Sequence, residues 1–421
     1  MKILVVGSGG REHAIIRKLK QSPKAEKIFC CPGNGGISAD AECVAINAMD
    51  IEGVVNFSKE NQIDLVVVAP DDPLAAGMVD ALNAEGIMTF GPTKAAAQIE
   101  ASKVFAKDLM KQHNIPTASY EVFDDPAKAL SYIEQKNEYP VVIKADGLAL
   151  GKGVVVAATI DEAKQAVIEM MQGGKFGRSG ARVLIEECMV GREVTVLCFC
   201  DGKTIVPMKA SQDHKRVFDG DKGPNTGGMG AFAPSPLYTR HIAERTEREI
   251  LLPTLRAMNA EGFTFKGVLY VGLRLTKDGP KVVEYNARFG DPETQVVLPL
   301  LDSDLFAIMR AVREQRLAEM DIRWKDGAAA CVVLASGGYP GKYEGGKPIS
   351  GLEEAEAMGA TVYHAGTKRT DAGYVTAGGR VLGVTALGDT LADAIHKAYA
   401  AAEQIHFDGA HMRRDIGKMD M

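Results

Sequence analysis

Residues 142–157 read VIKADGLALGKGVVVA, two β-branched runs joined by a glycine-rich turn. Such a turn between two strands can close over a triphosphate, because its backbone N–H groups and lysines offset the phosphate charge. No Walker A sequence opens a helix here, so this is not a P-loop. The alternative is a solvated hairpin with two surface lysines. The residues that favour a nucleotide site are Lys144, Gly147, Gly151, Lys152 and Gly153.

The chain around this turn shows three patterns. Residues 1–100 alternate β-branched runs with helical segments, which predicts βαβ units and a Rossmann-like parallel sheet. Residues 101–327 begin in one helical stretch and continue as an α+β unit, in which we expect the two strands within 182–202 and a hairpin at 267–286 to share one antiparallel sheet. Residues 328–421 predict a small α+β domain. The expected fold class is therefore multidomain, α/β followed by α+β.

Composition excludes several classes of protein. The formal net charge of −6 over 421 residues argues against a nucleic-acid or membrane-surface role for the whole molecule. Seven cysteines without CxxC spacing support neither a disulfide framework nor a zinc site. The first apolar run, residues 3–6, is too short for a signal peptide, and no stretch approaches the ~18 apolar residues of a membrane span. A cytoplasmic location is expected.

The first strand runs into a second glycine-rich turn, VVGSGGREHA at residues 5–14. Backbone N–H groups at a helix start can bind an anion. A dinucleotide fingerprint would need a third glycine and an acidic residue after the second strand, and both are missing. We therefore expect Gly9, Gly10 and Arg11 to bind a substrate phosphate, with plain turn chemistry as the alternative.

Acidic side chains gather around the linker in LIEECMVGREV, residues 184–194. Glu186, Glu187 and Glu193 can accept hydrogen bonds from an adenine amino group and ribose hydroxyls. A solvated acidic loop is the alternative.

The segment EYNARFGDPETQ, residues 284–295, carries the strongest metal signal. Glu284 and Asn286 are two apart on a predicted strand, so both side chains leave one face, as oxygen ligands for Mg²⁺ would. Arg288 offers a planar fork for a carboxylate or phosphate. The alternative is a strand end closed by a structural pair between Arg288 and Asp291.

Residues 211–234, SQDHKRVFDGDKGPNTGGMGAFAP, predict a long charged loop. Structureless loops of this length are uncommon in compact domains and are usually functional. His214 within it is a candidate general base, although a lone histidine is more often structural.

Taken together, these motifs in this order resemble the glycinamide ribonucleotide synthetase family of the ATP-grasp superfamily, and the resemblance runs from end to end. The motifs that carry it are GSGGREHA, KADGLALGKGV, IEE followed by G-x-E, SQDHKR with GPNTGGMGA, and EYNARFGDPETQ. The resemblance implies ATP-grasp central domains within residues 101–327, with a lid at about 120–187.

The reaction that the resemblance implies belongs to de novo purine biosynthesis. ATP, glycine and 5-phosphoribosylamine give glycinamide ribonucleotide, ADP and phosphate through an acyl phosphate, with Mg²⁺ or Mn²⁺ as cofactor. Small molecules are then the partners, and a monomer is compatible with this chemistry. The loop from Gly147 to Gly153 would close over the acyl phosphate and exclude water.

The resemblance also implies roles for individual residues. The nucleotide would contact Lys103, Lys144, Gly147, Gly151, Lys152, Gly153, Glu186, Glu187 and Glu193. The metal would be bound by Glu284 and Asn286. The catalytic set would be Arg288, Asp213, His214 and Lys215. The other substrates would contact Gly9, Gly10, Arg11, Asn225, Thr226, Gly227, Gly228, Met229, Asp291, Pro292 and Glu293.

Two departures from the family pattern and three rival functions remain open. The usual GPEAPL is APDDPL here, residues 69–74, and the strand at 268–276 lacks an acidic second metal ligand. One rival is another ATP-grasp ligase or carboxylase with a different substrate pair. The others are a nicotinamide-dependent oxidoreductase and a nucleotide-binding regulator without turnover.

Overall fold

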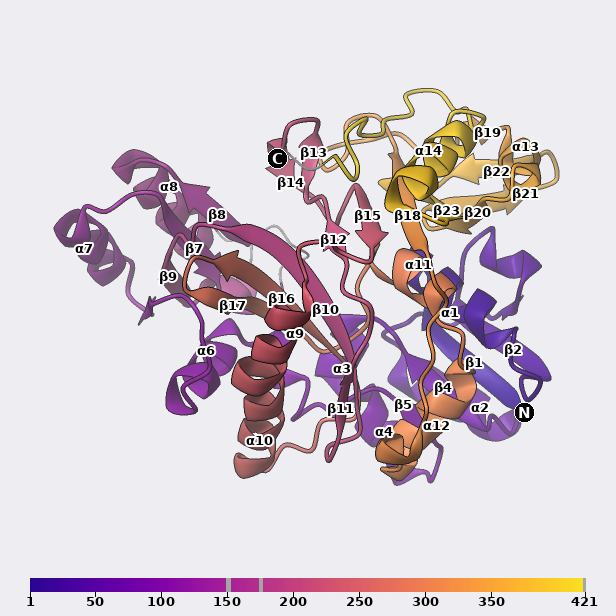
Figure 1. The fold of residues 1–421 in the computed structure, drawn as a ribbon, viewed down its shortest axis with the longest axis horizontal. Coiled ribbons are helices and arrows are strands. Elements are labelled where there is room, and N and C mark those ends of the chain that lie inside the picture. Colours follow the sequence, from indigo (N-terminus) through magenta and orange to yellow (C-terminus); the bar gives the residue numbers. More distant parts are fainter. Residues whose placement is uncertain (149–152, 174–176, 419–421) are drawn as a thin grey trace.

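The computed structural model describes residues 1–148, 153–173 and 177–418 (Figure 1). The N-terminal elements are β1 (Lys2–Gly7), α1 (Gly10–Leu19), β2 (Lys27–Pro32), β3 (Glu42–Cys43), α2 (Ile51–Glu60), β4 (Leu65–Val68), α3 (Asp71–Ala76), α4 (Met78–Ala84) and β5 (Thr89–Phe90). The predicted parallel sheet is confirmed, and its five strands lie in the order β3-β2-β1-β4-β5. Leu4 and Val6 face one apolar core, whereas Ile3 and Val5 face another. Burial of both faces is typical of a parallel sheet.

The helical stretch after this sheet is two helices, α5 (Gln98–Ala101) and α6 (Lys103–Gln112). The prediction of one continuous stretch is wrong, because Ser102 has an extended backbone with φ −130° and ψ 114°. The Ser102 hydroxyl accepts the Phe105 N–H at 3.1 Å and caps α6. It also donates to Asp146 Oδ1 at 3.1 Å. The start of α6 is therefore attached to the glycine-rich turn.

A separate antiparallel sheet lies at the left of Figure 1, within the predicted lid at about 120–187, and is called the lid sheet for that reason. Its elements are β6 (Tyr120–Phe123), α7 (Pro126–Lys136), β7 (Val141–Ala145), β8 (Val154–Ala157), α8 (Ile160–Met171) and β9 (Val183–Glu187). The strand order is β6-β9-β7-β8. Ile133 of α7 and Val167 of α8 pack on Ile143 and Ile185 of the sheet. The glycine-rich turn connects β7 to β8.

The central sheet contains β10 (Arg192–Cys200), β11 (Ile205–Pro207), β16 (Gly267–Thr276) and β17 (Gly279–Asn286). Its order is β11-β10-β16-β17, and all of its pairs are antiparallel. The prediction that both strands within 182–202 belong to this sheet is wrong, because both edges of β9 are already paired with β6 and β7. The residues between β9 and β10 connect the two sheets, and Val190 among them is 87% exposed. Helices α9 (Arg240–Thr246) and α10 (Leu252–Ala260) cover this sheet.

Residues 211–234 are not a structureless loop, so that prediction is wrong. They contain β12 (Gln212–Asp213), β13 (Arg216–Phe218), β14 (Lys222–Asn225) and β15 (Gly230–Ala233). Strands β13 and β14 form a hairpin. Strand β15 pairs with β18 (Ala328–Ala335), and β12 pairs with β15. Both strands therefore belong to a sheet built mainly by C-terminal residues.

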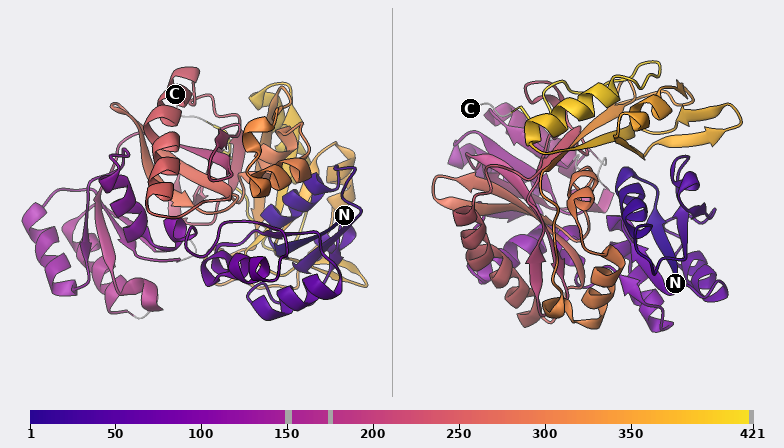
Figure 2. Two further views of the ribbon diagram at one scale, coloured as in Figure 1. Left: turned by 90° about the horizontal axis from the view of Figure 1, so that it is seen from below. Right: turned by 45° about the vertical axis from the view of Figure 1, so that its right-hand side comes forward.

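The C-terminal part completes this sheet in the order β12-β15-β18-β23-β20. Its remaining elements, with the helices that precede it, are α11 (Thr294–Val297), α12 (Leu305–Glu314), β18 (Ala328–Ala335), β19 (Pro348–Ile349), α13 (Leu352–Ala357), β20 (Thr361–His364), β21 (Thr367–Thr370), β22 (Gly373–Thr376), β23 (Arg380–Gly388) and α14 (Leu391–Ala402). Figures 1 and 2 show the N-terminal and C-terminal parts side by side, at the end of the molecule away from the lid. Across the described residues, no helix is both long and apolar enough to cross a membrane.

Candidate active site

Strand β17 ends with two oxygen-bearing side chains on one face. Glu284 and Asn286 are both partly exposed, whereas Tyr285 between them is 3% exposed. The Tyr285 hydroxyl lies 2.6 Å from Thr254 Oγ1 on the opposite, core-facing side. This alternation agrees with the period expected for a strand. The two candidate metal ligands therefore face the same space.

Basic side chains surround the Glu284 carboxylate. Lys215 Nζ lies 3.4 Å from Glu284 Oε1 and 3.5 Å from Glu193 Oε2. Burial alone would raise the pKa of Glu284, but nearby lysine charges outweigh it and lower the pKa to about 2. These lysines are, in order of effect, Lys215, Lys144 and Lys103. Glu284 is therefore an anion at neutral pH.

Glu193 belongs to the same charge cluster. Its second carboxylate oxygen, Oε1, accepts a hydrogen bond from Arg274 NH2 at 2.6 Å. The charge of Lys215 lowers the pKa of Glu193, against burial, and Arg274 lowers it further. Glu193 therefore faces two cations in this structure.

Glu186 connects the lid sheet to this cluster. Lys107 Nζ and Lys144 Nζ lie 3.1 and 2.9 Å from Glu186 Oε2, and all three side chains are buried. Lys144 Nζ also donates to the carbonyl oxygen of Val283 at 3.1 Å, next to Glu284. The other oxygen of Glu186, Oε1, is buried without a hydrogen-bond partner in the described part of the chain. Buried acceptors are normally satisfied, so Oε1 is suited to a ligand donor.

Glu187 points away from Glu186, as neighbours on a strand do. Its carboxylate accepts the Ser119 hydroxyl at 2.7 Å and lies 3.9 Å from Lys281 Nζ.

The glycine-rich turn approaches Lys103 at the start of α6. Lys103 Nζ donates to the carbonyl oxygen of Gly147 at 2.6 Å. Burial lowers the pKa of Lys103, while the Glu284 charge opposes this effect. At the far end of the turn, the Gly153 carbonyl accepts the Ala145 N–H at 2.9 Å. Two expected contacts lie outside the described residues: Gly151 and Lys152.

Arg288 is paired with a carboxylate that the sequence analysis did not single out. Arg288 NH2 lies 2.9 Å from Glu100 Oε1, and Glu100 Oε2 accepts the Ala287 N–H at 2.7 Å. Burial raises the pKa of Glu100 to about 7 although Arg288 opposes the shift. The alternative pair between Arg288 and Asp291 is wrong, because Asp291 contacts Arg380 instead, at 3.2 Å.

The turn after β17 meets the N-terminal helix at Asp291. Gln295 Nε2 donates to Asp291 Oδ1 at 2.7 Å. A Cβ atom added to Gly10 would lie only 2.7 Å from Gln295 Nε2, so the two segments approach closely at this glycine.

Some hydrogen-bond donors of the N-terminal glycine-rich turn already bond to oxygen atoms of the protein. The Gly9 N–H donates to Glu12 Oε2 at 2.6 Å. Arg11 Nε donates to Glu12 Oε1 at 2.7 Å, and its NH1 donates to the Phe289 carbonyl at 3.2 Å. The assignment of Gly9, Gly10 and Arg11 to a substrate phosphate stays a prediction.

Residues 225–229 comprise the last residue of β14 and its connection to β15, and they lie beside Lys215. Asn225 ends β14, and the Thr226 hydroxyl donates to the Lys215 carbonyl at 2.8 Å. Met229 is fully buried and packs in a small apolar cluster. The loop is thus fixed to the backbone of Lys215, while the Met229 side chain belongs to the core.

Two carboxyl groups near Lys215 resist ionisation. Burial raises the pKa of Asp213 to about 7, although Lys215 opposes the shift. Burial also raises the pKa of Glu293, whose side chain is 3% exposed. Repulsion from the Glu293 carboxylate adds to the shift of Asp213, whereas Lys215 opposes the shift of Glu293.

Sequence reasoning missed three residues of this region: Lys107, Glu100 and Arg380. Each acts through a partner far along the chain, Glu186, Arg288 or Asp291 respectively. No local pattern marks such pairs.

Comparison with protein families decides the relationship. Residues 1–100 match the phosphoribosylglycinamide synthetase N domain, residues 101–294 its ATP-grasp (A) domain, and residues 329–419 its C domain. The chain belongs to the phosphoribosylglycinamide synthetase family. The ATP-grasp domain of this family implies that the chain binds ATP.

Similar proteins extend over the whole chain. A phosphoribosylamine–glycine ligase of Mesorhizobium japonicum is 50% identical over 417 residues, 99% of this chain and 98% of that protein. One of Caldanaerobacter subterraneus is 49% identical, covering 99% of both chains. The crystal structure of phosphoribosylamine–glycine ligase from Thermotoga maritima has a TM-score of 0.85 and 34% identity, covering 99% of this chain and 100% of that one.

A more distant likeness concerns the fold alone. The biotin carboxylase domain of Hydrogenobacter thermophilus 2-oxoglutarate carboxylase has a TM-score of 0.74 at 16% identity, covering 98% of this chain and 91% of that one.

In this phosphoribosylglycinamide synthetase family member, the partly exposed His214 and the buried His364 predict sensitivity to acid. Burial lowers the pKa of His214 to about 4 and that of His364 to about 3. The unfolded chain protonates histidine near pH 6.5, so it binds more protons than the folded chain between about pH 6.5 and 4. The free energy of unfolding should therefore fall as pH drops through this range.

Urea unfolding at pH 7 and pH 5 measures this effect. His214→Gln should remove about 1–2 kcal/mol of the difference between the two pH values. An equal pH dependence in the variant and the parent would show that His214 does not titrate as described.

Gly228 gives a second prediction for this family member. Its φ is +120°, and an added Cβ would lie 2.4 Å from Pro292 Cδ. Gly228→Ala should lower the free energy of unfolding by about 1–3 kcal/mol, measured by urea titration. Gly262→Ala is the matched control, because Gly262 has φ +81° and nothing within 4 Å. Equal losses in both variants would contradict a packing role for Gly228.

Proposed function

We propose that this chain joins glycine to 5-phosphoribosylamine with ATP, and that the reaction passes through glycyl phosphate. The ligase activity itself, in purine biosynthesis, follows from membership of the family. The observation that carries the proposed route is the Glu284 carboxylate, kept anionic by lysines where the lid meets the central sheet. Phosphoryl transfer needs this kind of charge neutralisation and alignment, not a protein nucleophile.

The proposed route has two steps. A glycine carboxylate oxygen attacks the γ-phosphorus of ATP, the bond to the bridging oxygen breaks, and ADP leaves. The amine nitrogen of phosphoribosylamine then attacks the acyl carbon, loses a proton and displaces phosphate. One oxygen of the glycine carboxylate therefore ends in the phosphate product.

We assign Glu284 and Asn286 to a Mg²⁺ or Mn²⁺ ion. Their oxygens share one strand face, and the lowered pKa of Glu284 makes it an anion, so both suit a hard cation. Within the described residues, no group of three or more His, Cys, Asp or Glu could hold a metal ion. Phosphates and water would complete the coordination. When bound, such a cation neutralises phosphate charge.

We assign the lid junction to the nucleotide. Lys103 and Lys144 lie between the glycine-rich turn and Glu284, where they would contact ATP phosphates. The unpartnered Oε1 of Glu186 supports a hydrogen bond from the adenine amino group. The remaining proposed nucleotide contacts are Gly147, Gly151, Lys152, Gly153, Glu187 and Glu193.

The other substrates would lie between the central sheet and the terminal parts. Arg288, partly exposed at 18% of its side chain, would bind the glycine carboxylate. The raised pKa of Asp213, about 7, suits the group that takes the proton from the attacking amine. Lys215 and His214 would line this pocket. The remaining proposed contacts are Gly9, Gly10, Arg11, Asn225, Thr226, Gly227, Gly228, Met229, Asp291, Pro292 and Glu293.

Two assays test this function. Freshly generated phosphoribosylamine should give ADP only when glycine is present, whereas bicarbonate or other amino acids should not replace glycine. With glycine labelled with ¹⁸O in both carboxylate positions, each phosphate released should carry one ¹⁸O atom. Equal ADP formation with bicarbonate would favour a different ATP-grasp substrate pair, and unlabelled phosphate would contradict the acyl phosphate.

We also propose the domain limits 1–100, 101–327 and 328–421, with a lid at about 120–187, for a monomer that works in the cytoplasm. Limited proteolysis followed by mass spectrometry, together with light scattering, tests the limits and the oligomeric state. Cleavage concentrated elsewhere, or a dimer mass, would contradict them.

A further inference from the structure

Arg380, at the start of β23, joins segments that belong to the proposed acceptor pocket. Its NH1 donates to the carbonyl oxygens of Gly227 and Asp291, each at 2.8 Å, and lies 3.5 Å from that of Gly228. Its NH2 lies 3.2 Å from Asp291 Oδ2. One guanidinium from the C-terminal part therefore binds the loop at 225–229 and Asp291 together.

The segments that Arg380 joins are packed tightly against one another. Gly228 lies against the Pro292 ring, with no room for a side chain. Asp291 accepts a hydrogen bond from Gln295, which in turn lies against Gly10 at the start of α1. A displacement of Asp291 would therefore be transmitted to the loop and to the N-terminal turn.

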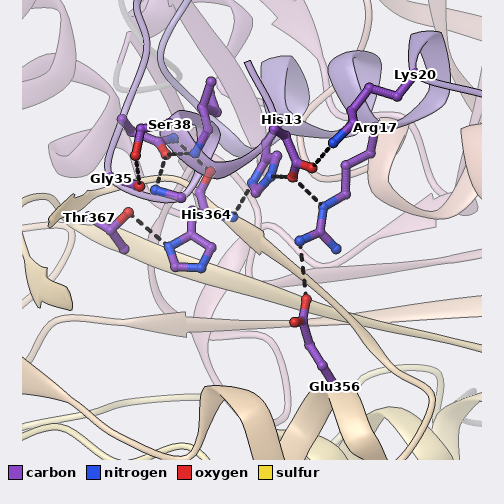
Figure 3. A network of polar contacts seen from close by, with 12 residues as sticks. His13, Arg17, Lys20, Gly35, Ser38, Glu356, His364 and Thr367 are labelled. Atoms are coloured by element: carbon purple, nitrogen blue, oxygen red, sulfur yellow. Dashed lines mark hydrogen bonds and ion pairs between the residues drawn. The ribbon is translucent and has the colours of Figure 1, made fainter. Parts of the chain in front are cut away.

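The sheet that carries Arg380 is itself fixed on α1, as Figure 3 shows. The His364 N–H on β20 donates to His13 Nδ1 at 2.8 Å, and His13 Nε2 bonds Asp40 Oδ2 at 2.9 Å. Arg17 bonds Asp40 at 2.9 Å and Glu356 at 3.1 Å. Strand β20 pairs with β23. Arg380 therefore lies on a sheet that is hydrogen-bonded to α1, the helix that follows the N-terminal glycine-rich turn.

We propose that Arg380 is a positioning residue of the ligase reaction, which holds the loop at 225–229 and Asp291 in the arrangement that the phosphoribosylamine pocket requires. The inference rests on the proposed function. The observed donors of Arg380 are directed at protein oxygens, so it acts through the segments that it joins. A planar guanidinium can bond two carbonyl oxygens and a carboxylate at once, whereas the ammonium group of lysine lacks this fork.

The test compares Arg380→Lys and Arg380→Ala with the parent enzyme. The KM for phosphoribosylamine should rise about tenfold or more in both variants, because small displacements of positioning groups are costly. The Kd for ribose 5-phosphate, measured by calorimetry as a stable probe of the same pocket, should rise in parallel. The KM for ATP should stay within about twofold of the parent value, since the Glu284 cluster is not contacted by Arg380.

Arg369→Lys is the matched control, because Arg369 is an exposed arginine on β21 in the same C-terminal part. It should leave both KM values and the ribose 5-phosphate Kd unchanged. Should Arg380→Ala fail to fold, Arg380→Lys, which keeps the charge, still decides the question. Equal increases in the KM for ATP and for phosphoribosylamine, or no change in either, would overturn the inference.

The two proposals fail in different ways. A parent enzyme without glycine-dependent ADP formation would refute the proposed function, whatever the variants do. An active parent with an unaltered Arg380→Lys variant would refute only the positioning role.

Discussion

Glu284→Gln should lower the rate of ADP formation by about 10²–10³-fold at saturating Mg²⁺, which corresponds to ~3–4 kcal/mol of lost charge stabilisation. The glutamine side chain keeps the shape of Glu284 but removes the anion that Lys215 contacts at 3.4 Å. The proposed metal ion would then lose a charged ligand, so that the phosphate charge would be less well neutralised. The measurement is a coupled ADP assay over a range of Mg²⁺ concentrations.

Asp278→Asn is the control for this variant, because Asp278 lies exposed at the turn of the same β16–β17 hairpin. It should have near-parental activity and the same dependence on Mg²⁺. Activity of Glu284→Gln within about tenfold of the parent, with an unchanged Mg²⁺ requirement, would refute the metal assignment.

Lys144→Met should impair both folding stability and the use of ATP. Lys144 and Lys107 contact the same oxygen of Glu186, at 2.9 and 3.1 Å, so removing either leaves a buried carboxylate with one cation. We expect a loss of about 3 kcal/mol or more in the free energy of unfolding for each variant. Only Lys144 also reaches the Val283 carbonyl beside Glu284. Lys144→Met should therefore also raise the KM for ATP by about 10²-fold.

The comparison of Lys144→Met with Lys107→Met separates these effects. Urea unfolding should give similar losses of stability, whereas steady-state kinetics should show the large change in ATP use only for Lys144→Met. A similar KM for ATP in both variants would mean that Lys144 acts on Glu186 alone and does not contact the nucleotide.

The strand that carries the proposed metal ligands could be predicted because the pattern that indicates it lies within a few consecutive residues. The spacing of Glu284 and Asn286 fixes a shared face through the period of a strand. The parallel N-terminal sheet was predictable for the same reason, since apolar runs such as the one at residues 3–6 alternate with helical segments.

The parts that the sequence did not reveal depend on pairing between distant segments. Strand β9 belongs to the lid because β6 and β7 occupy both of its edges, and no pattern within residues 182–202 shows this. The sequence also did not show the partner of Arg288: Asp291 was only the alternative considered, and the fold supplies Glu100 from α5. Arg380 was missed because its partners come together only when the C-terminal sheet docks.

A crystal structure with a non-hydrolysable ATP analogue, Mg²⁺ and glycine tests the central claim most directly. We expect a metal ion bound by Glu284 and Asn286, the terminal phosphate between Lys103 and Lys144, and a glycine carboxylate oxygen in line with that phosphate. A nucleotide bound away from Glu284, or a metal held without Glu284 and Asn286, would contradict it.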